Sequence, residues 1–370
     1  MDRRYPRRSP ARRLPIAGAV VLVAAVAAAV VIPAAADARV DLPDKTPAEL
    51  LQFAAASDVT AMTGTIEQTS DLGLPDLSGL TDSPDGTDSR AGASDAIDLL
   101  TGSHTAEVYF DGDRSRLQVL DRLAERNVYV DRAAGEGWFV DSETQTATHF
   151  TVDGDMSPPQ PRRDATGQTP QQMLDDALAT LGESTEILVG TDGRVAGRDV
   201  YELVLAPNDE AGLVDEVRFA IDGETGAALA ASVTARGADR PAFDISFTDV
   251  SFAAPDPATL AYTPAPGYIV EEKALSSPHA GATQETETDA AARPVVHGEG
   301  WTAVVELPPA DMSTSEARGQ DAATLESLTR PVAGGRVLET ALVTVYFADD
   351  GRVFAGAVSA EHLAQVAAGD

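Results

Sequence analysis

Short segments of alternating polar and apolar residues, each closed by a turn signal, recur along most of this 370-residue chain. They lie at residues 59–71, 103–110, 115–121, 126–132, 137–141, 146–151, 185–196, 198–206, 214–222, 227–236 and 241–252. Aspartate-glycine pairs such as Asp111-Gly112 and Asp222-Gly223 are typical of the tight turns that join antiparallel strands. Because alternation every second residue gives a strand one apolar face, the pattern predicts one large antiparallel sheet.

Two helices are predicted among these strands. Thr46-Pro47, followed by Glu49, has the form of a capping box and predicts a helix over residues 47–57. Thr169-Pro170 predicts a second helix over residues 169–182, with apolar residues at helical spacing. The expected fold class is therefore α+β: one large antiparallel sheet that carries helices on one face.

Composition excludes several kinds of site. The formal net charge of −32 repels nucleic acid and anionic lipid headgroups, so no nucleic-acid partner is expected. The chain has no cysteine, which removes disulfides, thiolate metal ligands, cysteine nucleophiles and a lipid-modified cysteine anchor. We expect neither a metal site nor a cofactor.

An uncharged apolar run at residues 14–36 follows six arginines that begin at Arg3. At about 1.5 Å per helical residue it is long enough to cross a bilayer, and the arginines would stay on the cytoplasmic side. Ala36-Asp37-Ala38 also offers the small-x-small site of a signal peptidase. Residues 1–38 are thus either a membrane anchor or a cleaved signal peptide. Both interpretations place the chain outside the cytoplasmic membrane, either anchored to it or secreted.

The C-terminal part of the chain differs in composition. Residues 271–295 include a stretch with almost no large apolar side chains, which predicts a disordered linker between a domain at 44–270 and a small unit at 296–370. In that unit we expect strands at 299–307, 336–348 and 352–358. A helix at 321–329 and another from Ser359 complete a small α+β unit.

Enzyme motifs are missing from the sequence. The five histidines are scattered and form no H-E-x-x-H pattern, and no nucleophile elbow or phosphate-binding loop is present. His149 is the residue that could join an acidic group in a hydrolase site, and we interpret it as structural or exposed. The D-G-D triplets at 111–113 and 153–155 lack the further ligands of a calcium loop and are interpreted as turns. We predict that the protein is not an enzyme.

The remaining feature is apolar area on a curved sheet. It is either an ordinary core between sheet and helices, or a groove that accepts acyl chains with the helices as its lid. Burial of each CH₂ contributes about 0.8 kcal/mol, so a groove of this kind needs no charged group. The candidate groove residues are Val108, Phe110, Met173, Leu174, Leu178, Val217, Phe219, Ile221, Phe243, Ile245 and Phe247.

Long stretches of the chain resemble LolA-like lipoprotein-carrier proteins of high-GC Gram-positive bacteria. These are TPAELLQFAAASDVTAMTGTIEQTSDLGLP (46–75), LLTGSHTAEVYFDGDRSRLQVLDRLAERNVYVD (99–131) and GWFVDSETQTATH (137–149). The resemblance continues through TPQQMLDDALA (169–179), VAGRDVYELVLAP (195–207), VRFAIDGETGAALAASVTARG (217–237) and FDISFTDVSFAAPD (243–256). It covers residues 46–270 in order.

The resemblance implies an open half-barrel with helices on its concave side, a fold shared with envelope-stress regulators of the RseB/MucB type. It implies a lipid-binding groove and no catalytic residues. The expected function is therefore an extracytoplasmic, non-enzymatic protein that binds lipid acyl chains or a lipoprotein. The alternative is an envelope sensor that binds an anti-sigma factor or another membrane regulatory protein. Unlike the usual carrier, this chain has an additional unit at 296–370.

Overall fold

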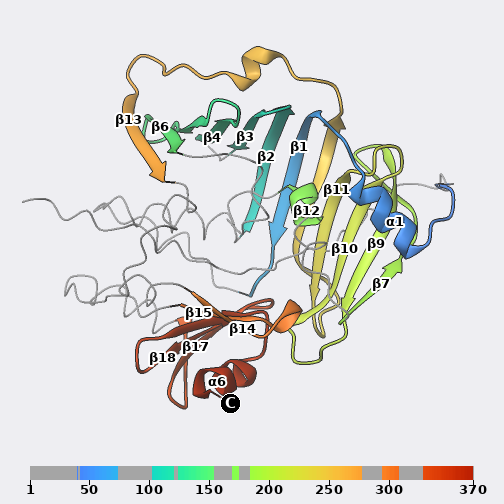
Figure 1. The fold of residues 1–370 in the computed structure, drawn as a ribbon, viewed down its shortest axis with the longest axis vertical. Coiled ribbons are helices and arrows are strands. Elements are labelled where there is room, and N and C mark those ends of the chain that lie inside the picture. The colour runs from blue at the N-terminus through green and yellow to red at the C-terminus, as the bar shows by residue number, and fades with distance from the viewer. Residues whose placement is uncertain are drawn as a thin grey trace, which may run out of the picture.

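The computed structural model describes residue 40 and residues 42–73, 102–120, 124–153, 169–174, 184–276, 294–307 and 328–369. Within them the chain forms two sheets and few helices (Figure 1). The apolar run at 14–36 and its arginines lie outside the described residues, as does most of the helix predicted at 321–329. No helix in the described ranges has both the length and the apolarity to cross a membrane.

Thirteen strands form the large sheet, and they match the alternating segments of the sequence closely. They are β1 (Ala61–Ser70), β2 (Gly102–Asp111), β3 (Arg114–Leu120), β4 (Glu125–Asp131), β5 (Glu136–Asp141), β6 (Thr146–Asp153), β7 (Thr185–Val189), β8 (Gly193–Val195), β9 (Arg198–Pro207), β10 (Val214–Asp222), β11 (Ala228–Ala235), β12 (Pro241–Ser251) and β13 (Ile269–Ser276). Their order across the sheet is β13-β6-β5-β4-β3-β2-β1-β12-β11-β10-β9-β7, and β8 pairs with β9.

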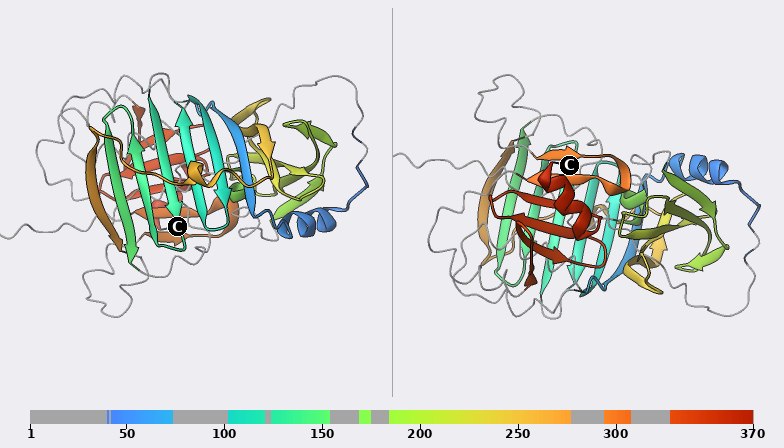
Figure 2. Two further views of the ribbon diagram at one scale, coloured as in Figure 1. Left: turned by 90° about the horizontal axis from the view of Figure 1, so that it is seen from above. Right: turned by 90° about the horizontal axis from the view of Figure 1, so that it is seen from below.

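One strand departs from the antiparallel prediction. β13 pairs in parallel with β6, whereas the other strand pairs described in this sheet are antiparallel. The reason is the segment 252–268, which leaves β12, contains the short helix η2 (Pro257–Leu260) and crosses the sheet to its far edge (Figures 1 and 2). Residues 271–276, predicted as the start of the linker, therefore belong to a strand.

The two faces of the large sheet differ in chemistry, as alternation requires. Cross-strand register places Val108 of β2 beside Leu117 of β3, and Leu117 beside Val128 of β4, on one face. Their sequence neighbours, such as Tyr109 and Arg116, lie on the other face. We call these the apolar face and the polar face. Segment 252–268 crosses the polar face, because its Tyr262 stacks on Tyr129 there.

The helices cover the β7–β12 part of the apolar face. Helix α1 (Pro47–Ala55) begins with the predicted capping box: Thr46 Oγ1 accepts from the Glu49 N–H, and the Glu49 carboxylate accepts from the Thr46 N–H at 2.8 Å. It packs against β7 and β9 and buries Leu50 and Ala54 in the main core. At the second predicted helix the structure describes a helical segment at 170–174, with Thr169 and Gln172 capping each other.

The second sheet has six strands in the order β14-β15-β19-β18-β17-β16. They are β14 (Val295–His297), β15 (Val304–Leu307), β16 (Arg330–Val332), β17 (Gly335–Glu339), β18 (Thr344–Ala348) and β19 (Val353–Gly356), with the short helix η3 (Gly300–Thr302) before β15. The segment predicted as one strand at 336–348 is the hairpin β17–β18, because Thr340 caps a tight turn with its side chain. Helix α6 (Ala360–Ala368) starts at the N-cap Ser359 and packs on β18 and β19.

Backbone hydrogen bonds join the two sheets. The Leu213 N–H donates to the Ala357 oxygen at 2.8 Å, and the Ala341 N–H donates to the Leu72 oxygen at 2.9 Å. Trp301 Nε1 donates to Thr185 Oγ1 at 2.8 Å. Leu342 is fully buried in the same hydrophobic cluster as the large sheet's core, so the joint is apolar as well as hydrogen-bonded.

Candidate functional site

The predicted groove residues fall into two groups in the structure. Nine of them are packed in the main core with 7% or less of their surface exposed: Val108, Met173, Leu174, Val217, Phe219, Ile221, Phe243, Ile245 and Phe247. All of these except Val108 lie in the interior between the β10–β12 strands and the helices. Val108 and Phe110 lie on β2, where the helical cover ends, and Phe110 is partly exposed. Leu178 lies outside the described residues.

Beyond β2 the apolar face continues over β3–β6, where Val119 of β3 is buried but most of the other apolar side chains are partly exposed. The sequence reasoning did not select these residues: Leu117, Val128, Val130, Phe139 and Phe150. Val128, Val130, Phe139 and Phe150 belong to neither of the two hydrophobic clusters formed by the described residues. The alternating apolar residues at 126–132 and 137–141 are the sequence feature from which this part of the apolar face could have been predicted.

The second sheet presents its own apolar face toward this region. Helix α6 covers one side of that sheet, where Val337, Tyr346 and Phe354 are buried. Alternation puts other apolar side chains on the opposite side, where Val305 and Ala355 are buried and Val345 packs against the main core. Four more on that side are partly exposed and belong to neither cluster: Leu307, Leu338, Phe347 and Val353. The views show this sheet on the side of β2–β6 away from segment 252–268, so the two apolar faces look toward each other (Figures 1 and 2).

We call the partly exposed residues Phe110, Leu117, Val128, Val130, Phe139 and Phe150 the large-sheet surface. Leu307, Leu338, Phe347 and Val353 form the small-sheet surface. Charged groups border the large-sheet surface at its outer edge, where Lys273 of β13 pairs in register with Phe150, and Glu271 with Thr148. Such an apolar area with a charged border suits an amphipathic ligand, whose apolar part is removed from water while its polar part stays at the edge.

His149 lies on the polar face, in a different place. Its Nδ1 is 2.9 Å from Glu272 Oε2 and its Nε2 is 3.3 Å from Glu136 Oε2. The hydrogen bond with Glu272 raises the pKa of His149 above its ordinary value; partial burial opposes this, and Glu136 adds to it. The ring also stacks on Trp138. With a carboxylate at each nitrogen, the imidazole has the contacts of an ion pair.

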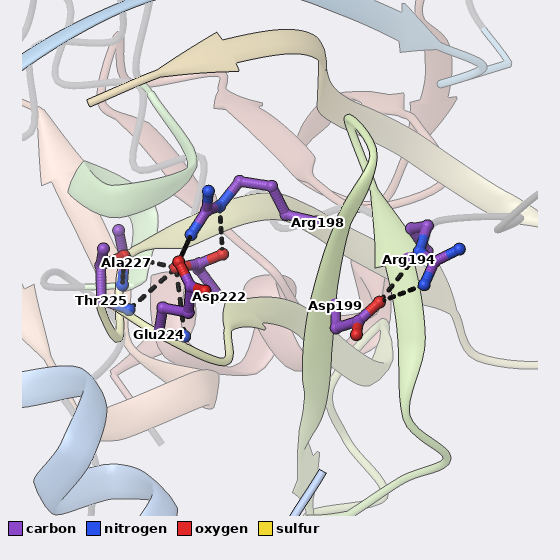
Figure 3. Close-up of polar contacts among 7 residues, drawn as sticks. All are labelled: Arg194, Arg198, Asp199, Asp222, Glu224, Thr225 and Ala227. Carbon is purple, nitrogen blue, oxygen red and sulfur yellow. Dashed lines mark hydrogen bonds and ion pairs between the residues drawn. The ribbon is translucent and has the colours of Figure 1, made fainter. Parts of the chain in front are cut away.

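A buried ion pair anchors the β10–β11 turn (Figure 3). Asp222 is 1% exposed and accepts from Arg198 at 2.5 and 3.0 Å, while Thr225 donates to it through both its N–H and its hydroxyl. Burial acts to raise the pKa of the Asp222 carboxyl, but the hydrogen bonds from Arg198 and Thr225 outweigh it and hold the pKa below its ordinary value. Every oxygen of this carboxylate is engaged, so we assign it a structural role.

In the described part of the chain, no group of three or more His, Asp or Glu side chains is placed to hold a metal ion. The D-G-D triplet at 111–113 is the turn between β2 and β3, and Gly112 there has a φ of +58°. The second triplet extends beyond the described residues.

No protein-family model matches the sequence, and no curated protein is significantly similar to it. In architecture the chain is similar to MucB and to LolA-superfamily proteins. The complex of MucA and MucB from Pseudomonas aeruginosa matches with a TM-score of 0.43 and 16% identity, covering 87% of this chain and 96% of that one.

Two further solved structures show the range of the similarity. A LolA-superfamily protein from Nitrosomonas europaea matches with a TM-score of 0.23 and 9% identity over 59% of this chain and 99% of that one. A putative outer membrane lipoprotein-sorting domain from Vibrio parahaemolyticus has a TM-score of 0.23 and 9% identity over 56% and 93%. These are the kinds of protein that the sequence resemblance names, whereas an origin in high-GC Gram-positive bacteria stays a prediction.

Proposed function

We propose that this protein binds lipid acyl chains, free or attached to a lipoprotein, without catalysing a reaction. The observation that supports the proposal is the large-sheet surface, which continues the buried core over β2–β6 as partly exposed apolar side chains. Water in contact with such an area is unfavourable by about 25 cal/mol per Å², so an acyl chain that covers it is stabilised. We place the binding site on β3–β6 rather than in the packed core.

We further propose that the second sheet forms the other wall of this site. Its Leu307, Leu338, Phe347 and Val353 are apolar, partly exposed and on the side that looks toward β2–β6. An acyl chain between two apolar walls loses more contact with water than a chain on one wall. This assigns a role to the unit at 296–370, which the carrier resemblance does not cover.

The test uses the full chain, purified in a mild detergent and examined by native mass spectrometry and by titration with a fluorescent fatty acid. The double variant Val128→Ser/Phe139→Ser should bind at least tenfold more weakly. Phe347→Ser should also weaken binding if the second sheet is a wall. The matched control is Leu188→Ser on edge strand β7, because Leu188 is 43% exposed and lies outside the proposed site. A wild-type protein that carries no lipid and takes up no fatty acid would refute the proposal.

The N-terminal run supports an extracytoplasmic location, where membrane lipids are accessible from outside. We propose that residues 14–36 either anchor the protein or direct its export. The mass of the native protein distinguishes the two: a chain that begins near Ala38 has lost a signal peptide, and a chain that retains Arg3 is anchored.

A second candidate function is that of an envelope sensor that binds an anti-sigma factor or another membrane protein. It is favoured by the edge strand β14, whose Val295 and Val296 are 50% and 55% exposed. Unpaired edges with apolar side chains are sites at which a partner strand can add. A membrane protein cross-linked to the wild-type chain but lost with Val296→Lys would support this role, and equal recovery with both would contradict it.

A further inference from the structure

A continuous row of side chains crosses the polar face of the large sheet from β2 to β13. Cross-strand register pairs each member directly with the next: Tyr109, Arg116, Tyr129, Trp138, His149 and Glu272. The Arg116 guanidinium lies 5.1 Å from the centre of the Tyr129 ring, and the Trp138 and His149 rings are 4.6 Å apart. The row therefore runs from a central strand to the outer edge of the sheet, and Tyr262 contacts both Tyr129 and Trp138 in its middle.

His149 is the last link before the edge, and it joins two strands that are far apart in sequence. Glu136 comes from β5 and Glu272 from β13, and one carboxylate lies at each ring nitrogen. The His149 side chain is 18% exposed, while Glu136 and Glu272 are 48% and 72% exposed. A neutral imidazole has one N–H and can donate to only one of these carboxylates, whereas the imidazolium donates to both.

Strand β13 has few other attachments. Its described side chains, Ile269 to Ala274, are all exposed, and Ile269 is 62% exposed. Its backbone pairs with β6 on one side only, because β13 is the edge of the sheet. Elements with little buried apolar surface open most readily, so a single side-chain link can decide how firmly β13 is held.

Segment 252–268, which leads into β13, is held by the same row. Tyr262 stacks on Tyr129 at 5.2 Å and lies 5.3 Å from Trp138. Trp138 thus contacts both Tyr262 of the segment and His149. A change at His149 acts on β13 through Glu272 and on the segment through Trp138.

We propose that His149 is a pH-operated clamp, which fastens β13 and segment 252–268 to the large sheet when its imidazole is protonated and releases them when it is neutral. The inference rests on geometry and does not depend on lipid binding. It concerns the polar face and the edge of the sheet, whereas the proposed acyl site lies on the apolar face.

The charges around His149 determine which of its protonation states is favoured in the folded protein. Glu136 and Glu272 are the charged groups that act on it, and both favour the imidazolium. The other titratable groups close by are Tyr129 and Tyr262, whose pKa values are raised by burial, so both phenols stay neutral near pH 7. Because the pKa of His149 is higher in the folded protein, its contribution is complete below the ordinary histidine value of about 6.5 and is lost as pH rises through the raised value.

The first experiment measures hydrogen exchange of the β13 amides in the full-length protein between pH 5.5 and 8.5, corrected for the intrinsic pH dependence of exchange. We expect protection to fall at least threefold as pH rises in the wild type. In His149→Gln, which cannot become charged, protection should be low and independent of pH. The control is His297→Gln in the second sheet, where His297 faces the single carboxylate Glu306 at 2.8 Å; it should keep the wild-type profile at β13.

The second experiment records tryptophan fluorescence over the same range. A protonated imidazole stacked on indole quenches its emission, so the wild type should brighten as His149 loses its proton. His149→Gln should lack this step, and Glu272→Gln should move it to lower pH. A β13 protection profile that is the same in wild type and His149→Gln would overturn the proposal, as would protection that does not change with pH in the wild type.

Discussion

At the scale of single residues, two ion pairs near the β8–β9 turn look alike and differ in burial. Arg198–Asp222 has its carboxylate enclosed, while both side chains of Arg194–Asp199 are nearly half exposed (Figure 3). An exposed pair is worth about 0–1 kcal/mol, but removal of one partner of a buried pair leaves an uncompensated charge and costs about 3–5 kcal/mol.

The first prediction compares these pairs. Asp222→Ala should lower the free energy of unfolding by about 3 kcal/mol, because the N–H groups of the β10–β11 turn lose their acceptor and Arg198 keeps only the exposed Glu224 as a partner. Asp199→Ala is the control and should change it by less than about 1 kcal/mol. Urea denaturation at pH 7 measures both values; equal effects of the two substitutions would show that burial does not decide the strength of these pairs.

The Asp244 carboxyl on β12 has no hydrogen bond or ion pair with the residues that the structure describes, and burial raises its pKa to about 7. Ser232, which faces it on β11, is fully buried, and its hydroxyl also has no hydrogen-bond partner among the described residues. In the folded protein Asp244 holds its proton at pH values where the unfolded chain has lost it. The native state therefore binds more protons, and this residue's contribution to stability falls as pH rises.

The second prediction follows from this decrease in the contribution of Asp244 to stability as pH rises. Between pH 4 and pH 7 the wild type should lose stability relative to Asp244→Asn, by about 1–2 kcal/mol after allowance for solvent screening. At pH 8 the variant should be the more stable of the two. Thermal unfolding of both proteins over this pH range tests it; a stability difference that stays constant with pH would contradict it.

At the scale of elements, glycines allow the sheet to carry aromatic rings flat against its backbone. A Cβ on Gly137 would collide with the Phe150 ring and with the Tyr129 carbonyl, and one on Gly64 would lie 2.6 Å from the Phe247 ring. Both aromatic side chains lie on the apolar face. Glycine in these strands is thus required by close approach rather than by a turn.

The third prediction concerns Gly137. Gly137→Ala should destabilise the protein by about 1–3 kcal/mol, since the backbone of Tyr129 cannot move away as a side chain could. Gly212→Ala is the matched control, because its added methyl would meet atoms at 3.5 Å or more, which is ordinary contact. Chemical denaturation compares them, and a Gly137→Ala protein as stable as the control would show that Phe150 and β4 adjust freely.

At the scale of the whole molecule, the two sheets share one core. Leu342 belongs to the turn β17–β18 of the second sheet, yet it is fully buried in the cluster of the first, together with Val343 and Ala357. Hydrogen bonds at Leu213, Ala341 and Trp301 cross the same joint. We therefore expect the sheets to unfold together.

The fourth prediction tests that coupling. Leu342→Ala should lower the free energy of unfolding by about 2–5 kcal/mol and lower the unfolding midpoint of both sheets. Hydrogen exchange read separately for β11 and β18 near the midpoint measures each sheet. Loss of protection in β18 alone, with β11 unchanged, would mean that the two sheets unfold independently.

Much of the architecture could be predicted from local patterns. The strands at 103–110, 126–132 and 241–252 and the helix cap at Thr46 depend on alternation and on turn or cap residues within a few positions, and all are found in the structure. β13 was assigned partly to a linker, because its exposed side chains show no apolar alternation and its pairing partner lies more than 100 residues away. The hairpin at Thr340 was missed because its turn is closed by a threonine side chain rather than by Asp-Gly.

For the candidate site, the sequence determined which residues are apolar and that Phe219 and Phe247 would lie on the same kind of face as Val108 and Phe110. Alternation is a local property, so it could do this without knowledge of the fold. Only the tertiary structure decided which part of that face is covered by α1 and residues 170–174 and which part, around Val128 and Phe139, is partly exposed. The physical reason is that burial depends on elements brought together from distant parts of the chain, and no single strand encodes what will pack against it.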